Sequence, residues 1–245
     1  MTSTISIDKI RHGVKSAVRS LGYDIRQVDS YVNLRPADFI RSRNIDVVVD
    51  VGANVGQYAE QLRHDGYTGW IVSAEPVRAT YDALASRAAA DSRWRTMNLA
   101  FGEQAGIAQI NVSQMSEFSS CLTQLPAAQA FVPEARVLRQ ESITVARLDD
   151  AFAEFPAGRA YLKIDTQGFE EQVLKGGAAC LSNFLGIQME LSVVHLYEGT
   201  WRFHEAVAYM VERGFEISNI LPVNFDPADQ VSLLEVDCIF RRRAA

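Results

Sequence analysis

The strongest constraint on the fold of this chain is the stretch of residues 47–60, VVVDVGANVGQYAE. In it, an apolar run is followed by two glycines and then by a helical pattern. The run is typical of a buried strand that ends near Asp50, and Gly52 and Gly56 lie in the turn before the helix. A strand, a glycine turn and a helix in this order bring a ligand close to backbone at the carboxyl edge of a parallel sheet. The unit therefore predicts an α/β fold with a nucleotide-like cofactor.

Short apolar runs alternate with helical patterns beyond Ile45, as expected for βαβ units and a mainly parallel sheet. The predicted strands are residues 46–50, 70–74, 94–99, 160–164 and 185–190, and the predicted helices are residues 57–64, 76–90, 170–181 and 203–213, with Pro76 in a first turn. Two closing strands, 215–221 and 231–240, are joined only by a turn-rich loop and should be antiparallel. Residues 102–147 are less regular. They are expected to hold a hairpin at 107–112 and a substrate-facing polar loop at 116–123.

Composition excludes several protein classes for the 245 residues. No apolar run approaches the roughly 20 residues of a membrane span, and the N-terminus lacks a signal-peptide pattern, so we expect a cytoplasmic protein. A net charge of −6 argues against a protein whose main ligand is nucleic acid. Cys121, Cys180 and Cys238 lie far apart and predict neither a disulfide framework nor a zinc site.

The first 40 residues predict a separate helical segment. Apolar residues recur at helical spacing over residues 8–21, and basic residues outnumber acidic ones between Lys9 and Arg43. An amphipathic helix of this kind can act as a lid, a packing element or a dimer contact. Its basic face also permits peripheral contact with an anionic membrane.

Charge distinguishes between the nucleotide cofactors. Asp50 directly precedes the glycines and would repel the pyrophosphate of a dinucleotide, whereas an acid favours the ammonium and sulfonium of S-adenosylmethionine. Glu75 follows the second predicted strand, where a carboxylate can accept both hydroxyls of an adenosine ribose. The alternative is that Asp50 and Glu75 merely cap the helices that follow them. A dinucleotide-dependent oxidoreductase stays open as a second enzyme class.

Several further motifs carry a family resemblance: AEP at residues 74–76, NLAFGE at 98–103, LDD at 148–150, KIDTQGFEEQVLKG at 163–176 and QMELS at 188–192. Together with DVGANVGQYA at 50–59, these motifs resemble the FkbM-type methyltransferases, in order and at plausible spacing. The likeness spans about residues 47–240. The KIDTQG motif is much more specific than the glycine turn.

The resemblance implies a class I methyltransferase domain at residues 41–245, after the N-terminal helical segment of residues 1–40. Its Rossmann-like sheet has seven mainly parallel strands and an antiparallel last strand. The implied cofactor is S-adenosyl-L-methionine, with Asp50 and the glycines at its methionine end, Glu75 on the ribose and residues 98–101 beside the adenine. The expected cofactor-binding residues are Asp50, Gly52, Asn54, Gly56, Glu75, Pro76, Asn98 and Ala100.

The resemblance also implies O-methylation of a hydroxyl, on a sugar of a glycolipid or natural product. Asp165, at the end of the fourth strand of the common sheet, is the first candidate for the base that takes the hydroxyl proton. Glu190 and His195 lie in one strand-to-loop passage and are further candidates, although a lone histidine is often a packing residue. These three residue types can bind a divalent metal. No local ligand spacing such as HExxH is present, so no metal site is predicted. A cofactor-binding scaffold without transfer activity is the remaining alternative.

Overall fold

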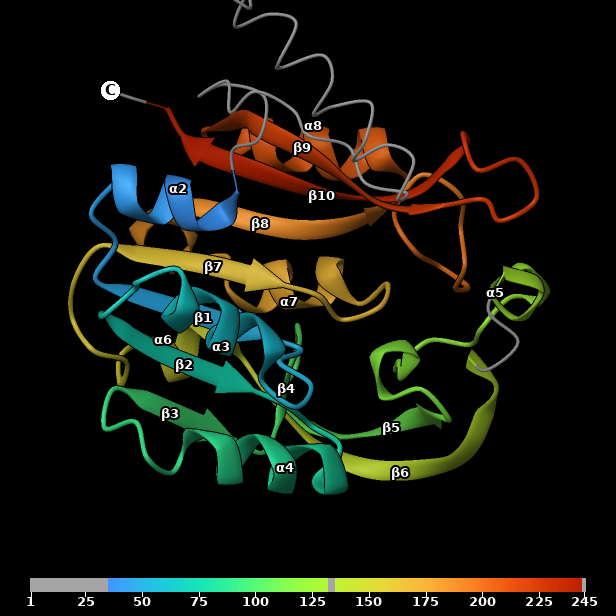
Figure 1. Ribbon diagram of the computed structural model, residues 1–245, viewed down its shortest axis with the longest axis horizontal. Coiled ribbons are helices and arrows are strands. Elements are labelled where there is room, and N and C mark those ends of the chain that lie inside the picture. The colour runs from blue at the N-terminus through green and yellow to red at the C-terminus, as the bar shows by residue number, and fades with distance from the viewer. Residues whose placement is uncertain (1–34, 132–134, 244–245) are drawn as a thin grey trace, which may run out of the picture. The chain divides into compact units, whose positions relative to one another are not determined.

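Strands and helices alternate along the described chain as the βαβ pattern predicts. The computed structural model describes residues 35–131 and 135–243 (Figure 1). A seven-stranded sheet has the order β3-β2-β1-β7-β8-β10-β9. Its strands are β1 (Val47–Val51), β2 (Trp70–Ala74), β3 (Trp94–Met97), β7 (Ala160–Ile164), β8 (Phe184–Ser192), β9 (Phe215–Phe225) and β10 (Leu233–Arg242). β10 is antiparallel to both β8 and β9, and the other pairs are parallel, which confirms the expected sheet.

Helices cover both faces of this sheet because successive side chains of a strand point to opposite faces. Val48 packs with α2 (Pro36–Ser42), α3 (Gln57–His64) and α4 (Arg78–Ala88). Val47 and Val49 pack on the other side, with α6 (Leu148–Phe152), α7 (Glu170–Gly176) and α8 (Phe203–Glu212). β1 and β7 are buried along their whole length, so their near-continuous apolar sequence follows from covered faces on both sides.

A second, three-stranded sheet lies at the carboxyl ends of the parallel strands (Figure 1). It consists of β4 (Ala100–Phe101), β5 (Gly106–Ser113) and β6 (Val137–Ala146), and the short helix α5 (Pro126–Phe131) lies between β5 and β6 in the chain. The hairpin predicted at 107–112 was wrong. These residues form part of one strand, β5, whose antiparallel partner β6 comes much later in the sequence.

Several element boundaries differ from the prediction for local reasons. α4 begins at Arg78, so Pro76 precedes the helix and is not in its first turn. α7 ends at Gly176, where a Cβ would lie 2.0 Å from the carbonyl oxygen of Gly102. The helix and the end of β4 therefore approach more closely than a larger residue permits. This contact explains Gly102 in the NLAFGE motif and Gly176 in the KIDTQGFEEQVLKG motif.

The compact unit that contains the sheet begins at Pro36, a few residues before the expected boundary. α2 belongs to this unit because Ala37 and Ile40 are buried in its core. The amphipathic helix predicted over residues 8–21 lies outside the described residues. Among the helices of residues 35–131 and 135–243, none is long and apolar enough to cross a membrane.

Candidate active site

A cavity of about 540 Å³ opens where β1, β2, β7 and β8 end. Its lining includes the turns after β1, β2 and β7, parts of β8, β9 and β10, the start of α3, and the segment after β5. The carboxyl edge of an open α/β sheet is the usual place for a ligand, and the volume suits a small molecule. The cavity is therefore the candidate active site.

The turn after β1 forms one wall of the cavity through its backbone. Gly52 has φ +76°, and a Cβ at this residue would lie 1.8 Å from the carbonyl oxygen of Asp165. The backbone N–H groups of Gly52 and Ala53 both donate to the carbonyl of Ala74, at 3.0 Å. This turn is thus held between β2 and the turn after β7, and only glycine fits there.

Glu75 lies in the same wall, just past β2, with 7% of its surface exposed. Its carboxylate accepts the backbone N–H groups of Asn54 at 3.0 Å and Val77 at 2.9 Å. Burial raises the pKa of Glu75 to about 7, although these two N–H groups favour the charged form. The amide of Asn98 donates to the carbonyls of Glu75 and Pro76 and so fixes the turn from behind.

Asp50 lies beneath this wall and does not line the cavity. It is fully buried in β1, where Ser73 Oγ donates to it at 3.4 Å and Lys163 Nζ lies 3.3 Å away. The expected direct contact between Asp50 and a cofactor is therefore not supported, because its side chain points into the protein. Repulsion by Asp50 also cannot exclude a pyrophosphate, since Lys163 offsets its charge.

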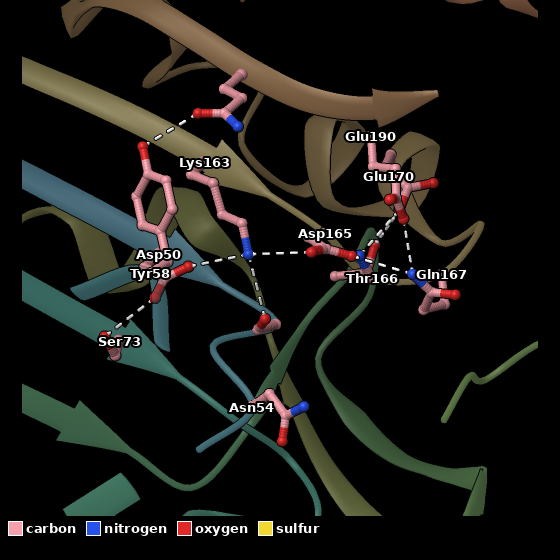
Figure 2. A network of polar contacts seen from close by, with 12 residues as sticks. Asp50, Asn54, Tyr58, Ser73, Lys163, Asp165, Thr166, Gln167, Glu170 and Glu190 are labelled. Atoms are coloured by element: carbon pink, nitrogen blue, oxygen red, sulfur yellow. Dashed lines mark hydrogen bonds and ion pairs between the residues drawn. The ribbon is translucent and has the colours of Figure 1, made fainter. Parts of the chain in front are cut away.

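Lys163 contacts both the turn after β1 and the residue that follows β7, as Figure 2 shows. Its Nζ lies 3.3 Å from Asp50 Oδ1, 3.3 Å from Asp165 Oδ2 and 3.4 Å from the Gly52 carbonyl oxygen. Burial alone would lower its pKa, but the carboxylates of Asp165 and Asp50 raise it, so the ammonium stays charged. The sequence motifs point to no catalytic or cofactor-binding role for this residue. The available signal was a lysine in the buried strand AYLKI, since a buried lysine needs a carboxylate partner.

Two other expected cofactor residues, Gly56 and Asn98, also lie outside the cavity lining. Gly56 has φ +97°, and a Cβ there would lie 2.8 Å from the ring of Trp94. Its role is therefore close packing of α3 on the sheet. The remaining expected residues line the cavity: Gly52, Asn54, Glu75, Pro76 and Ala100.

Asp165 and Glu190 form a carboxylate pair in the cavity wall (Figure 2). The amide Nε2 of Gln167 donates to Asp165 Oδ1 at 3.1 Å and to Glu190 Oε2 at 2.7 Å. Burial raises the pKa of Glu190 well above its ordinary value, and the charge of Asp165 adds to this effect. Asp165 is the more exposed of the two and is paired with Lys163, so it presents a carboxylate to the cavity.

His195 does not join this pair. It lines a separate depression with His204, Arg202 and apolar residues of β10 and α8. Proximity in the sequence was misleading because the chain leaves the sheet edge after Ser192, at the end of β8. His195 is therefore not placed to take a proton from a molecule in the main cavity.

Additional acidic side chains, which were not among the predicted site residues, reach the cavity from β10. Glu235 accepts the amide of Asn224 at 2.7 Å, and Asp237 lies opposite Glu190 in the strand register. Burial raises the pKa of both carboxyls. Within residues 35–131 and 135–243, no three His, Cys, Asp or Glu side chains are grouped so that they could hold a metal ion.

The polar segment expected to face the substrate does line the cavity. Ser116, Glu117, Phe118, Ser119 and Cys121 belong to the lining. Ser116 Oγ donates to Asn54 Oδ1 at 3.0 Å, so the segment contacts the turn after β1. It begins with the short helix η1 (Ser116–Phe118) and brings both polar and apolar surface to the site.

Comparison with known sequences identifies a family. Residues 50–217, more than half of the chain, match the sequence model of the methyltransferase FkbM domain. The predicted resemblance is thereby confirmed. No curated protein sequence matches the chain.

Solved structures with a similar fold are methyltransferases of low sequence identity. Fibrillarin from Aeropyrum pernix, with natively bound S-adenosyl-L-methionine, is 13% identical, with 80% of this chain and 66% of that chain covered and a TM-score of 0.47. A TehB-like S-adenosylmethionine-dependent methyltransferase from Corynebacterium glutamicum is 13% identical, with coverage of 96% and 97% and a TM-score of 0.40. An O-methyltransferase from neocarzinostatin biosynthesis is 11% identical, with coverage of 84% and 55% and a TM-score of 0.43. These distant likenesses carry no weight for the acceptor, and the family assignment rests on the sequence match.

Proposed function

The chain belongs to the FkbM-domain family of methyltransferases, and we propose that it is an S-adenosylmethionine-dependent O-methyltransferase. Its acceptor is a hydroxyl group of a small or carbohydrate-bearing molecule, with sugars of glycolipids and natural products as the preferred class. The family assignment decides against the dinucleotide-dependent oxidoreductase.

One observation supports the proposal: a single cavity is lined by the carboxyl groups of Glu75 and Asp165, to which we assign ribose binding and proton acceptance. Glu75 lies past β2, and Asp165 lies past β7, on either side of β1 in the sheet. The backbone of residues 52–54 lies between them. This arrangement suits an adenosine at the β2 side and a reacting methyl group at the β7 side.

The residues on the β2 side fit the adenosine part of the cofactor. The buried carboxylate of Glu75 retains free lone pairs for two ribose hydroxyls, because each of its oxygens accepts only one backbone N–H. Leu99, Ala100, Phe101 and Ile110 supply apolar surface for the adenine. When bound, the cofactor supplies an electrophilic methyl group on a sulfonium.

The residues on the β7 side serve the acceptor. As the acceptor oxygen forms its bond to the methyl carbon and the carbon–sulfur bond breaks, the hydroxyl proton passes to the carboxylate of Asp165. A base so placed contributes typically 10²–10⁴-fold to the rate, and alignment of the hydroxyl supplies much of the rest. Lys163 forms an ion pair with Asp165 and holds it against the turn after β1.

The first experiment measures binding of S-adenosylhomocysteine by calorimetry to the wild type, Glu75→Gln and Glu170→Gln. Glu170 is a matched control because burial also raises its pKa to about 7, but its carboxylate accepts Thr166 and Gly168 N–H groups and does not line the cavity. We expect binding to weaken in Glu75→Gln and to persist in Glu170→Gln. No binding by the wild type would overturn the proposal.

The second experiment tests transfer with labelled S-adenosylmethionine on a panel of glycolipids, free sugars and phenolic natural products. We expect one acceptor class to become labelled, and Asp165→Asn to lower kcat by at least a factor of 10². Binding without transfer to any acceptor would instead indicate a cofactor-binding scaffold.

A further inference from the structure

Both polar atoms of the Gln167 side chain make hydrogen bonds at the centre of the site. The amide nitrogen donates to both Asp165 and Glu190, and the amide oxygen accepts the hydroxyl of Tyr197 at 2.9 Å. A glutamine offers two N–H donors and one carbonyl oxygen, so each donor serves one carboxylate. The orientation of the amide is thereby determined, because a flipped amide would point its oxygen at two carboxylates.

The backbone of Gln167 is held as firmly as its side chain. Gln167 and Gly168 have φ values of 54° and 98°, an unusual conformation for a residue with a Cβ. Ser120 Oγ donates to the Gln167 carbonyl at 2.7 Å. At Gly168, a Cβ would lie 2.9 Å from Thr200 Oγ1 and 3.1 Å from Leu122 Cδ1. The turn is therefore packed against the segments around residues 120 and 200.

Tyr197 links the amide to the segment of residues 116–125, which lines the cavity at residues 116–119 and 121. Its hydroxyl also lies 3.3 Å from the carbonyl oxygen of Phe118. Backbone hydrogen bonds join the two segments on either side of it, from Glu198 to Thr123 at 2.9 Å and from Leu125 to Leu196 at 2.8 Å. Movement of the 116–125 segment would therefore move Tyr197 and the Gln167 amide.

We propose that Gln167 is a positioning residue for methyl transfer, which holds Asp165 and Glu190 in one arrangement and couples that arrangement to the 116–125 segment. The inference rests on the proposed function, in which Asp165 takes the hydroxyl proton. A neutral donor is needed because Lys163 reaches only the Asp165 side of the pair. The two N–H groups stabilise the charged carboxylates and offset their mutual repulsion.

The test follows the carboxyl titration of Glu190 by carbon NMR in the free protein, so that it does not depend on cofactor or acceptor binding. In Gln167→Met the two donors are lost, and the titration midpoint of Glu190 should rise by about one pH unit. Gln167→Glu keeps the size of the side chain but adds a third carboxyl, so its midpoint should rise as well. Tyr197→Phe should give a smaller rise, because the amide remains but is less firmly held.

Gln124→Met is the matched control. The Gln124 amide donates to the carbonyls of Phe118 at 3.2 Å and Ala135 at 2.7 Å, so this change disturbs the 116–125 segment without touching either carboxylate directly. We expect it to raise the Glu190 midpoint less than Gln167→Met does, because both N–H donors of Gln167 remain. With a labelled acceptor from the panel, Gln167→Met should lower kcat on the order of 10²-fold and leave the KM for S-adenosylmethionine unchanged.

A midpoint in Gln167→Met and Gln167→Glu equal to that of the wild type would overturn the proposal, since a space-filling residue would behave in that way. A rise in Gln124→Met as large as in Gln167→Met would also overturn it. An unchanged midpoint in Tyr197→Phe would remove the coupling to the 116–125 segment. Failure of the wild type to bind S-adenosylhomocysteine would count against the proposed function alone, because the titration is measured without it.

Discussion

The turns after β1 and β7 border the same cavity but are built in opposite ways. The first offers backbone: Gly52 and Ala53 are bonded to β2, while the carboxylate of Asp50 before them is buried. The second offers side chains, because Asp165 and Gln167 point toward Glu190 and the cavity. The two turns touch, since a Cβ on Gly52 would meet the Asp165 carbonyl.

This difference suits the two tasks of a transferase. In the proposed function the cofactor is held by the backbone of this turn and by the Glu75 side chain that it bonds. The acceptor half needs groups that bind and release a proton, and such groups must be side chains held by hydrogen bonds. Lys163 contacts both turns, and the variants below test the contribution of each turn.

The largest effect is expected for Lys163→Met. This variant leaves Asp50 as a fully buried carboxylate without its cation, which should cost about 3–5 kcal/mol of unfolding free energy. The double variant Asp50→Asn with Lys163→Met should recover much of that loss, because no fully buried charge then stays unpaired. Denaturant unfolding measures both. A double variant no more stable than the single one would show that the ion pair does not hold the two turns together.

Gly52→Ala should be nearly as harmful, because the added methyl group would overlap the Asp165 carbonyl and the residue has positive φ. We expect a loss of about 3 kcal/mol and of S-adenosylhomocysteine binding. Gly66→Ala is the control, since Gly66 also has positive φ but has open space around it. It should cost only about 1–2 kcal/mol. Equal losses in both variants would mean that conformation, and not contact between the turns, makes Gly52 necessary.

Glu75 predicts a pH dependence of cofactor binding. Its pKa of about 7 means that the ribose-accepting carboxylate forms only as the pH rises through neutrality. The affinity for S-adenosylhomocysteine should therefore increase about tenfold between pH ~6 and pH ~8. Calorimetry should show this increase in the wild type and in Glu170→Gln, but not in Glu75→Gln. An equal increase in Glu75→Gln would assign the titration to another group.

The same raised pKa values make the folded state hold protons that the unfolded state releases. For Glu75 and Glu170, the stabilisation is complete below the ordinary pKa of 4.5 and is lost as the pH rises through about 7. The free energy of unfolding should therefore fall over that range in the wild type. The fall should be smaller in Glu75→Gln and in Glu170→Gln. A fall of equal size in all three proteins would contradict this assignment.

The smallest effect on cofactor binding is expected for Gly56→Ala. Gly56 has positive φ and faces Trp94 and not the cavity, so the change should reduce stability by about 2–3 kcal/mol and leave S-adenosylhomocysteine affinity unchanged. Denaturant unfolding measures the change in stability, and calorimetry on the same sample measures the affinity. Lost affinity at unchanged stability would restore Gly56 to the role that the sequence predicts, as a direct cofactor contact.

The sequence by itself determined the fold and the place of the site. Apolar periodicity located the strands of the main sheet, and the order of strand, glycine turn and helix placed a ligand at their carboxyl edge. Both signals are local, so they can be seen in a short stretch of chain. Glu75, Asp165 and Glu190 were found in this way, because each lies near the end of a strand and reaches the cavity.

Only the tertiary structure decided which polar groups face the ligand and which face each other. Asp50 is neutralised by a lysine from β7, and Gln167 joins carboxylates from two strands and a tyrosine from a third segment. His195 follows Glu190 in sequence but lies in another depression. The physical reason is that ion pairs and hydrogen bonds depend on distances of about 3 Å. Those distances are set by packing between segments far apart in the chain.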